Sequence, residues 1–446
     1  MPAFDYWDIV RFHAQWDAGV LKLADLFAIH GGHWHASGYL LSLPVGRLTN
    51  MNHAYEAGIN LALVLIGFFG LARIIDRMAD RFDASDAAPW AIALAAFFLF
   101  SIDQAENFFS GWQIAAFVNL AAAIWCIELL TRGAPNLVTT ALAAASAAAA
   151  IYGFGGGWAL LPIGFGLLFA QGAAFRGGTV GGASLALWCA FSASLLAHFV
   201  LAMGAGARAH ADSAIMPPRN LSEVAALINY THQFVTAPIT RFSKELAPAA
   251  GLLAAGLVVG AGCVARPPRG GLLAAIKRLA PMLALGAYAL GSGALAGLGR
   301  LDDRGAAQAR VFRYITQGNF FWIMAGALAV LAAAKTKGRQ RAAFTSAAIA
   351  IVAMKAGTIA NVLPQTLEDA RALRMAARHI ALCPDDTYTG SLKPIYAAEW
   401  QNVDDEFAFL RSERMSAFRA EARPNGECDA AAGSIGQEKR ARTTSR

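Results

Sequence analysis

Charged residues are scarce in this chain: Asp, Glu, Lys and Arg make up 15% of its 446 residues, whereas soluble proteins carry about 25%. Hydrophobic residues make up 57%, and the mean hydropathy is +0.44. Apolar runs close to the ~20 residues that cross a bilayer recur along most of the sequence. This composition excludes an ordinary soluble enzyme. It predicts an all-α fold, a polytopic transmembrane helical bundle.

Several other signatures are missing. The first residues lack the charged region and apolar core of a secretory signal peptide. The five cysteines show no metal-site spacing and no CxxC pair, and no serine nucleophile motif is present. The net charge of +7 comes without a basic stripe interleaved with aromatic residues, which argues against a nucleic-acid partner. Lys and Arg on cytoplasmic loops explain this charge.

The apolar runs divide the chain into four regions. We expect an outward amphipathic segment at 1–53, a transmembrane domain at 54–361, an outward polar segment at 362–425 and a disordered tail at 426–446. The transmembrane domain is predicted to contain about ten spans. They are 54–75, 87–103, 112–131, 136–152, 157–174, 182–204, 247–265, 272–297, 317–335 and 342–361.

Basic residues predict the orientation. They concentrate in loops on one side, beginning with Arg73, Arg77 and Arg81, and that side is expected to be cytoplasmic. The opening stretch, the C-terminal segment and the loops at 104–111, 205–246 and 298–316 then face outward. About 50 N-terminal residues would lie outside with no span before them. Either they cross with the first span or an initial helix is missing, and we favour the missing helix.

The stretch SIDQAENFFSGWQI, residues 101–114, is polar although its neighbours are apolar. Asp103 and Glu106 are three residues apart, so a helical turn would direct both to one side. Asn107 stands beside them, and Gln113 begins the next span. One interpretation is a solvated loop with capping residues. The other is a cavity wall, because an unpartnered Gln in an apolar run is costly.

A second polar cluster is HGGHWHASGY at 30–39, where three of the nine histidines fall within six residues. Imidazole binds many divalent metals, although this spacing fits no metal motif and an interfacial loop is the plainer interpretation. Asp5 and Asp8 precede the cluster on the same predicted side. Outward carboxylates suit either a general base or a divalent metal ion, so a metal cofactor remains open.

The third cluster, GRLDDRGAAQARVFRY at 299–314, places four arginines on the predicted outer side, against the general trend. Arg310 and Arg313 are three residues apart just before a span. The planar guanidinium group binds phosphate through two parallel donors. These arginines therefore suit an anionic lipid-linked substrate, or they pair with Asp302 and Asp303.

Taken together, these stretches resemble the bacterial polytopic membrane proteins related to C-type glycosyltransferases. FDYWDIV at 4–10 resembles the acidic stretch that follows the first helix of that family, with Asp5 and Asp8 as its acids. In GGHW at 31–34, only His33 matches the Asn-Glu-His-Arg segment of many members. That difference leaves the role of the segment in doubt.

Two later stretches also carry the resemblance. ENFFSGWQIAAF at 106–117 resembles an Asn-x-x-x-Gly-x-Gln stretch through Asn107, Gly111 and Gln113. RVFRYITQGNFFW at 310–322 resembles an Arg-Tyr segment through Arg313 and Tyr314. The family's acidic stretch normally follows a helix, which supports a missing first helix here.

The resemblance implies sugar transfer from a polyprenyl-phosphate-linked donor on the outer face of the bacterial inner membrane. Asp5 or Asp8 would be a base or metal ligand, and Arg310 and Arg313 would bind the lipid phosphate. The sugar pocket would contain Asp103, Glu106, Asn107 and Gln113, with His33 and Tyr314 as further substrate-binding residues. The alternatives are a transporter or flippase of lipid-linked saccharide and a non-catalytic membrane scaffold.

Overall fold

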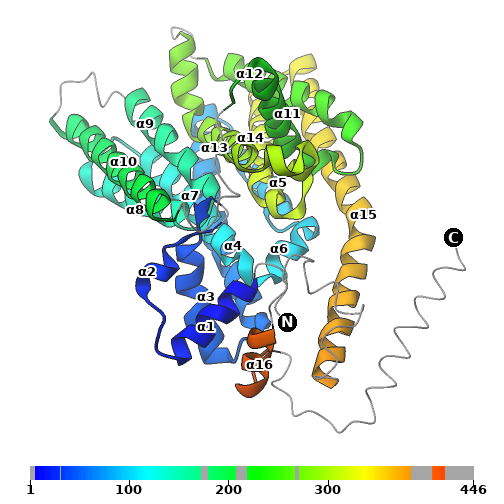
Figure 1. Ribbon diagram of the computed structural model, residues 1–446. Helices are drawn as coiled ribbons and strands as arrows, with labels where there is room; N and C mark the ends of the chain where they lie inside the picture. Colours follow the sequence, from blue (N-terminus) through cyan, green and yellow to red (C-terminus); the bar gives the residue numbers. More distant parts are fainter. Residues whose placement is uncertain are drawn as a thin grey trace, which may run out of the picture.

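The computed structural model describes residues 6–30, 32–171, 179–206, 218–266, 271–382 and 404–416. Helices dominate this part of the chain, and its sheet is a single two-stranded hairpin (Figure 1). Asp5 and the predicted disordered tail at 426–446 lie outside the described residues. The prediction of an all-α helical bundle is confirmed.

Each of the ten predicted spans coincides with a helical segment. Eight segments of the described chain are long and apolar enough to cross a membrane. Two further apolar segments, Leu137–Ile151 and Gly155–Ala170, are shorter. The chain is therefore a multi-pass membrane protein.

The long helices of the transmembrane domain are separated mostly by short turns and 3₁₀ segments. The helices (α) and 3₁₀ segments (η) of the first half are α4 (His53–Phe82), η2 (Ser85–Ala87), α5 (Ala88–Leu99), η3 (Ile102–Gln104), α6 (Ala105–Phe109), η4 (Gly111–Gln113), α7 (Ile114–Thr131), α8 (Leu137–Ile151), η5 (Gly155–Ala159) and α9 (Leu160–Ala170). In the second half they are α10 (Thr179–Gly206), α11 (Leu221–Thr240), η7 (Lys244–Leu246), α12 (Ala247–Ala265), α13 (Leu272–Arg304), η8 (Ala306–Arg310), α14 (Phe312–Lys335) and α15 (Gly338–Leu382).

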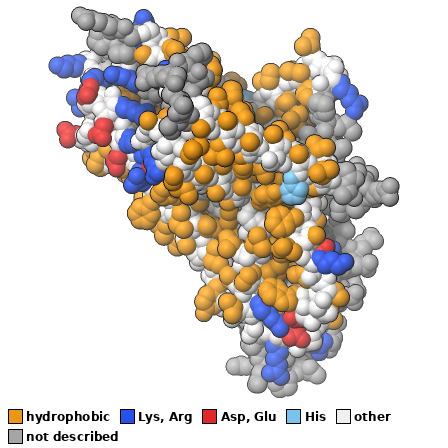
Figure 2. Space-filling view, turned by 90° about the vertical axis from the view of Figure 1, so that its left-hand side faces the viewer, with side chains coloured by type: hydrophobic (Ala, Val, Ile, Leu, Met, Phe, Trp, Pro, Cys, Tyr) orange, Lys and Arg blue, Asp and Glu red, His pale blue; other side chains and the backbone are white. Residues whose placement is uncertain are grey.

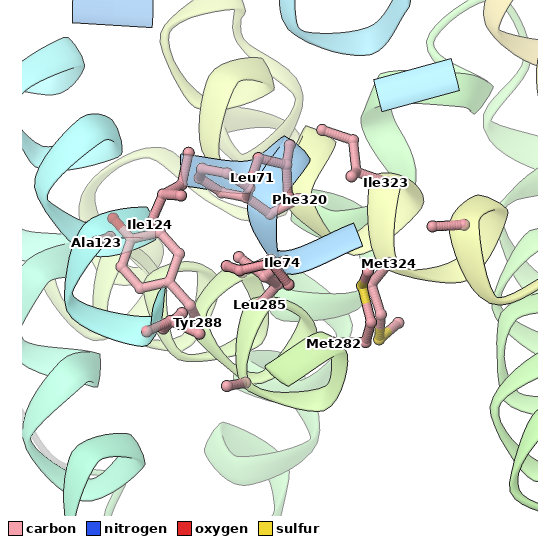
Figure 3. Close-up of a cluster of buried hydrophobic side chains, with 14 of the residues drawn as sticks. Leu71, Ile74, Ala123, Ile124, Met282, Leu285, Tyr288, Phe320, Ile323 and Met324 are labelled. Carbon is pink, nitrogen blue, oxygen red and sulfur yellow. The ribbon is translucent and has the colours of Figure 1, made fainter. Parts of the chain in front are cut away.

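Four of these helices, α4, α7, α13 and α14, form the centre of the bundle. Figure 3 shows side chains from all four in one apolar cluster, including Leu71, Ile124, Leu285 and Phe320, which are at most 1% exposed. Small residues let the helices approach closely. A Cβ on Gly286 of α13 would lie 2.5 Å from Met324 Sδ of α14. This central cluster fixes the relative positions of the helix ends that build the site.

The other helices surround this centre. Helices α8, α9 and α10 lie together on one side of the bundle, and α15 lies on another (Figure 1). Figure 2 shows a broad apolar surface with Lys, Arg, Asp and Glu gathered toward its edges. That distribution is the one expected of a surface that faces lipid, with charged groups near the headgroups.

One end of the bundle is basic, as predicted. The Nη1 group of Arg81 donates to the Arg278 carbonyl at 3.2 Å, and Lys335 Nζ lies 2.5 Å from Asp83 Oδ2. These contacts bring the end of α4, the start of α13 and the end of α14 together. We call this region the basic end, and the opposite region the cavity end. The assignment of the basic end to the cytoplasm remains a prediction.

The N-terminal residues form a compact unit at the cavity end. It comprises α1 (Trp7–Asp17), α2 (Leu23–Leu26), β1 (Ile29–His30), β2 (His33–Trp34), α3 (Ala36–Thr49) and the later α16 (Asp404–Ser412). Helix α16 lies beside α1 (Figure 1), and their buried side chains share one apolar cluster. Helix α3 approaches α7 so closely that a Cβ on Gly38 would lie 2.7 Å from Ala115 Cβ. The unit is thus attached to the membrane bundle.

Three predicted loop boundaries were wrong. The predicted loop at 205–246 contains the helix α11, which packs on α13 and α14 through Phe234 and Val235. The predicted loop at 298–316 is mostly helical, because α13 continues to Arg304 and α14 begins at Phe312. Helix α15 does not end at 361 but runs on to Leu382, into the region predicted as a polar segment.

Candidate functional site

The polar stretch 101–114 breaks the membrane helices between α5 and α7, and most of its side chains hold that break in place. Gln104 Nε2 donates to the carbonyls of Phe98 and Leu99, at 2.9 and 3.1 Å, and so caps the end of α5. Asn107 Nδ2 donates to the Phe312 carbonyl at 3.0 Å and to Thr316 Oγ1 at 2.9 Å. These amides connect the break to α14.

Asp103 forms a buried ion pair with Lys355 of α15. The Lys355 Nζ atom lies 2.7 Å from Asp103 Oδ2 and 3.0 Å from Oδ1, and both side chains are 0% exposed. Asn319 Oδ1 accepts from the same ammonium at 3.2 Å, and Ser101 donates to the carboxylate. Every strong polar group in this contact is therefore paired, as burial requires. Asp103 joins α15 to the break.

Gly111 is required by a second buried network. Tyr6 donates its hydroxyl hydrogen to Glu56 Oε1, and His53 Nδ1 lies 2.6 Å from Glu56 Oε2. A Cβ on Gly111 would lie 2.2 Å from that Oε2 atom and 2.4 Å from the Tyr6 ring. Only a glycine allows the backbone to approach this closely. The network fixes the N-terminal unit against the start of α4.

The short hairpin places the histidines. Ile29 pairs with Trp34 and His30 with His33 across a Gly-Gly turn, in which Gly32 has φ of 85°. Side chains alternate along a strand, so Trp34 points into the core, where it is 0% exposed, while His33 faces the other way. The His33 and His35 rings lie 4.5 Å apart between centroids, and His35 lies 4.6 Å from the Trp112 ring.

A cavity opens beside these histidines, and it gathers residues from segments far apart in the sequence. The hairpin contributes His30, the turn before α7 contributes Gln113, and α13 and α14 contribute Arg300 and Gln317. Its wall also includes His33, His35, Trp112, Phe154, Gly155, Gly156, Trp158, Phe234, Ser292, Arg313 and Tyr314. We refer to it as the outer cavity.

The charge of the outer cavity is positive. Arg300 and Arg313 are in its wall, and no Asp or Glu belongs to the part of the wall that the structure describes. Burial lowers the pKa of His35 well below its usual value, and the charges of His33, His30 and Arg300 lower it further. His35 is therefore neutral at physiological pH. The cavity suits an anionic ligand, which the two guanidinium groups would bind.

Gln317 and His35 present unused polar atoms to the outer cavity. Gln317 is 1% exposed, and neither its Nε2 nor its Oε1 has a hydrogen-bond partner among the residues that the structure describes. His35 is 3% exposed, and its Nδ1 is also without a partner in the described part of the chain. A buried polar group without a partner costs about 1–3 kcal/mol. Two such groups in one wall indicate that a polar ligand completes their hydrogen bonds.

Asp8 lies behind the cavity wall rather than in it. Its Oδ2 is 3.3 Å from His30 Nδ1, and its Oδ1 is 3.5 Å from Arg11 Nη1. His30 is in the wall and its ring lies 5.3 Å from that of Trp112. Asp8 therefore reaches the cavity through the imidazole of His30, whose Nε2 is on the far side of the ring from Asp8.

The structure thus brings some predicted site residues together and separates others. His33, Gln113, Arg313 and Tyr314 are in the wall of the outer cavity. Asp8, Asp103, Glu106, Asn107 and Arg310 are not, and Asp5 lies outside the described residues. Arg310 instead donates to Gln233 Oε1 at 2.8 Å and to the Thr240 carbonyl, so it fastens η8 to α11. Asp103, the amide nitrogen of Asn107 and Arg310 bind groups of the protein itself, and their role in a substrate pocket stays a prediction.

Sequence reasoning missed several residues of the wall. Gln317 stands in TQGN near the start of an apolar helix, and that position alone marks it as unusual in a span. His30, which was not predicted as a site residue, is brought beside the predicted His33 by the hairpin, and the pattern I-H-G-G-H-W indicates that hairpin through its Gly-Gly turn. The sequence does not mark Trp112 and Trp158 as cavity residues, because tryptophan is common at membrane interfaces.

The histidine cluster does not form a metal site with the described carboxylates. No group of three or more His, Cys, Asp and Glu side chains among the described residues is arranged to hold a metal ion. The histidine and tryptophan rings contact one another instead.

Comparisons with known proteins returned no relative: no protein-family model, no curated protein and no solved structure matches this chain. The candidate function therefore depends on the chemistry of the outer cavity.

Proposed function

We propose that this protein is a membrane glycosyltransferase that takes a sugar from a polyprenyl-phosphate-linked donor at the cavity end, on the outer face of a bacterial inner membrane. One observation carries the proposal. The outer cavity combines two arginines, a buried amide with no partner and indole rings, in a wall without a described carboxylate. Guanidinium groups bind phosphate, amides bind hydroxyls, and indole rings pack against the apolar faces of a sugar.

The position of the outer cavity also favours a lipid donor. Arg313 and Tyr314 begin α14, whose 24 residues end at Lys335. A helix of this length spans about 36 Å, slightly more than the hydrocarbon core. This length supports a position of the cavity at the level of the headgroups, where the phosphate of a lipid is found.

In the proposed reaction, residues in and behind the wall of the outer cavity have separate roles. An acceptor hydroxyl attacks the anomeric carbon of the sugar, and its proton passes to His30 Nε2. The bond from that carbon to the phosphate oxygen breaks, and the electron pair remains on the polyprenyl phosphate. Arg300 and Arg313 stabilise the charge of this leaving group. Asp8 orients His30 and stabilises the imidazolium that forms.

A transporter of lipid-linked saccharide is the second candidate, and the buried Asp103–Lys355 pair is the observation that favours it. In transporters such polar groups lie near the bilayer midplane. Here Asn319, which contacts Lys355, is the eighth residue of α14 and so about 10 Å from its start. That depth is about 7 Å from the centre of α14, on the side of the cavity end. The carboxylate and the ammonium of the pair bind each other, Ser101 and Asn319 rather than a substrate, which favours the enzyme.

Proteoliposomes distinguish these functions. The purified protein is reconstituted with undecaprenyl-phosphate-linked glucose and with undecaprenyl-phosphate-linked N-acetylglucosamine, together with a soluble extract of envelope acceptors. Release of undecaprenyl phosphate, absent with His30→Ala, supports the glycosyltransferase. Movement of uncleaved donor between leaflets, with no release, overturns it in favour of the transporter.

A further inference from the structure

A second cavity lies at the basic end of the bundle, and we propose that it binds the phosphate of an anionic lipid headgroup. It has a volume of about 300 Å³ and lies between the end of α4, the turn after α7, the end of α9 and the start of α13. Its wall includes Arg81, Thr131, Gln171 and Lys277. This inference is independent of the proposed glycosyltransferase activity, because the two cavities lie at opposite ends of the bundle.

The length of α13 measures their separation. Lys277 stands near the start of α13 and lines the basic-end cavity, while Arg300 stands near its end and lines the outer cavity. The 23 residues between these positions correspond to about 35 Å along the helix axis. The basic-end cavity is thus at the opposite headgroup level.

The positive charge of this cavity is not neutralised by a carboxylate of the described residues. Arg81 is held by main-chain carbonyls: its Nη1 donates to Arg278 at 3.2 Å and its Nη2 donates to Thr131 at 3.4 Å. These neutral acceptors fix the guanidinium group but leave its charge unbalanced. Neither Arg81 nor Lys277 forms an ion pair with a carboxylate of the described chain, and the part of the cavity wall that the structure describes contains no Asp or Glu.

Three other cations at this end are paired with carboxylates. Arg73 Nε and Arg77 Nη1 lie 3.0 and 2.8 Å from the same oxygen of Glu128. Lys335 is paired with Asp83 across the end of the bundle. Glu128 and Asp83 are thus bound to cations outside this cavity, and among the described residues Arg81 and Lys277 have no carboxylate partner, which leaves both for an external anion.

The side chains that line the basic-end cavity suit a phosphodiester with a polar headgroup. The remaining donors of Arg81 suit two phosphate oxygens, and the exposed Lys277 adds a mobile positive charge. Gln171 donates to the Leu130 carbonyl, whereas its Oε1 is buried and has no partner among the described residues. That acceptor matches a headgroup hydroxyl such as those of glycerol. Anionic lipids are attracted to basic pockets between transmembrane helices in the same way.

Native mass spectrometry of the full chain in detergent tests this proposal. The protein is mixed with phosphatidylglycerol, with phosphatidylethanolamine, or with inorganic phosphate. We expect preferential retention of phosphatidylglycerol, and a loss of about tenfold or more in its apparent affinity for Arg81→Gln and for Lys277→Gln. Arg339→Gln and Lys337→Gln make the same charge changes at exposed positions outside the cavity wall and should retain the lipid.

Each contrary result has a defined meaning. Equal retention of the two lipids overturns the proposal, as does unchanged retention by both cavity variants. Binding of inorganic phosphate without retention of phosphatidylglycerol overturns the lipid assignment and identifies a free-phosphate site. Lys277 is exposed, so its variant decides the result if Arg81→Gln fails to fold. The transfer assay is unaffected in every case, since neither residue lines the outer cavity.

Discussion

Asp8 Oδ2 lies 3.3 Å from Nδ1 of His30, and this contact joins the first helix to the wall of the outer cavity. A carboxylate placed behind an imidazole fixes the ring orientation and leaves the opposite nitrogen to exchange protons. Asp8, one of the two acids predicted from the sequence, thus contacts His30 and does not itself line the cavity proposed to bind the substrate. The group proposed to accept the proton is a histidine that was expected to belong to an interfacial loop.

This relationship predicts the effects of two substitutions on transfer. His30→Ala should reduce kcat about 100-fold or more, because it removes the base, while donor binding changes little. Asp8→Asn should reduce kcat less, since the imidazole remains. Asp25→Asn is the matched control, because Asp25 accepts from the Lys22 main-chain amide on the surface and does not line the outer cavity. If His30→Ala kept wild-type kcat, the proposed role of this histidine would be wrong.

Substitution of Gln317 should have opposite effects on the stability of the protein and on its binding of the lipid-linked sugar. Gln317→Leu removes two buried polar atoms that have no partner, so we expect the unliganded protein to gain about 1–3 kcal/mol in its free energy of unfolding. The same substitution should weaken binding of the lipid-linked sugar. Thermal unfolding and donor binding are measured on the same samples. A loss of stability together with unchanged binding would show that the amide serves the fold alone.

The Asp103–Lys355 pair should behave as a buried ion pair in which each charge needs the other. Lys355→Met is expected to destabilise the protein by about 3–5 kcal/mol, because it leaves a carboxylate buried without its cation. Adding Asp103→Leu should restore much of that loss. The extent of unfolding is followed in detergent–SDS mixtures. A double variant less stable than Lys355→Met would refute this coupling.

Gly111→Ala should disrupt the junction of the N-terminal unit and the bundle. The added Cβ would collide with Glu56 and Tyr6, so we expect a lower unfolding midpoint and faster proteolysis of residues 6–52. Gly58→Ala on α4 is the control, since nothing lies within 4 Å of the position that its Cβ would take. Alanine is the better helix former by about 1 kcal/mol, so that variant should be at least as stable as wild type. Equal behaviour of the two variants would contradict the proposed packing.

His13 makes the N-terminal unit sensitive to acid. Burial lowers the pKa of His13 from 6.5 to about 4, so the folded protein binds this proton more weakly than the unfolded chain does. The stabilisation is complete above the unfolded pKa of about 6.5 and is lost as the pH falls toward 4, by up to about 3 kcal/mol. Unfolding midpoints at about pH 7.5 and pH 4.5 should differ more for wild type than for His13→Gln. Equal differences would exclude this histidine as a cause.

The membrane helices could be predicted from the sequence because each is a long apolar run, and such runs have few alternatives to a helix in lipid. Helix α11 was missed because its residues mix Asn, Thr, His and Gln with apolar side chains. Its start signal was nevertheless present: Asn220 accepts from the Glu223 main-chain amide at 2.9 Å, as an N-cap does.

The site was harder to predict because its residues come from six separate segments. A polar residue in an apolar stretch indicates that its side chain has a polar partner. The sequence does not distinguish a partner in the protein from a bound ligand. Asp103 and Gln317 both stand in apolar surroundings, yet Asp103 is paired with Lys355 and Gln317 faces the cavity. Lys355 itself lies in a run that was read only as a span, and an ionisable residue there was a signal.

The most direct test of the account is the binding of undecaprenyl phosphate to the outer cavity. Native mass spectrometry compares wild type with Arg313→Gln, and with Arg219→Gln as an exposed control outside the cavity wall. The account predicts that wild type and the control retain the lipid and that Arg313→Gln loses about tenfold or more in apparent affinity. Equal retention by all three proteins, or no retention by any, would contradict a phosphate site in this cavity.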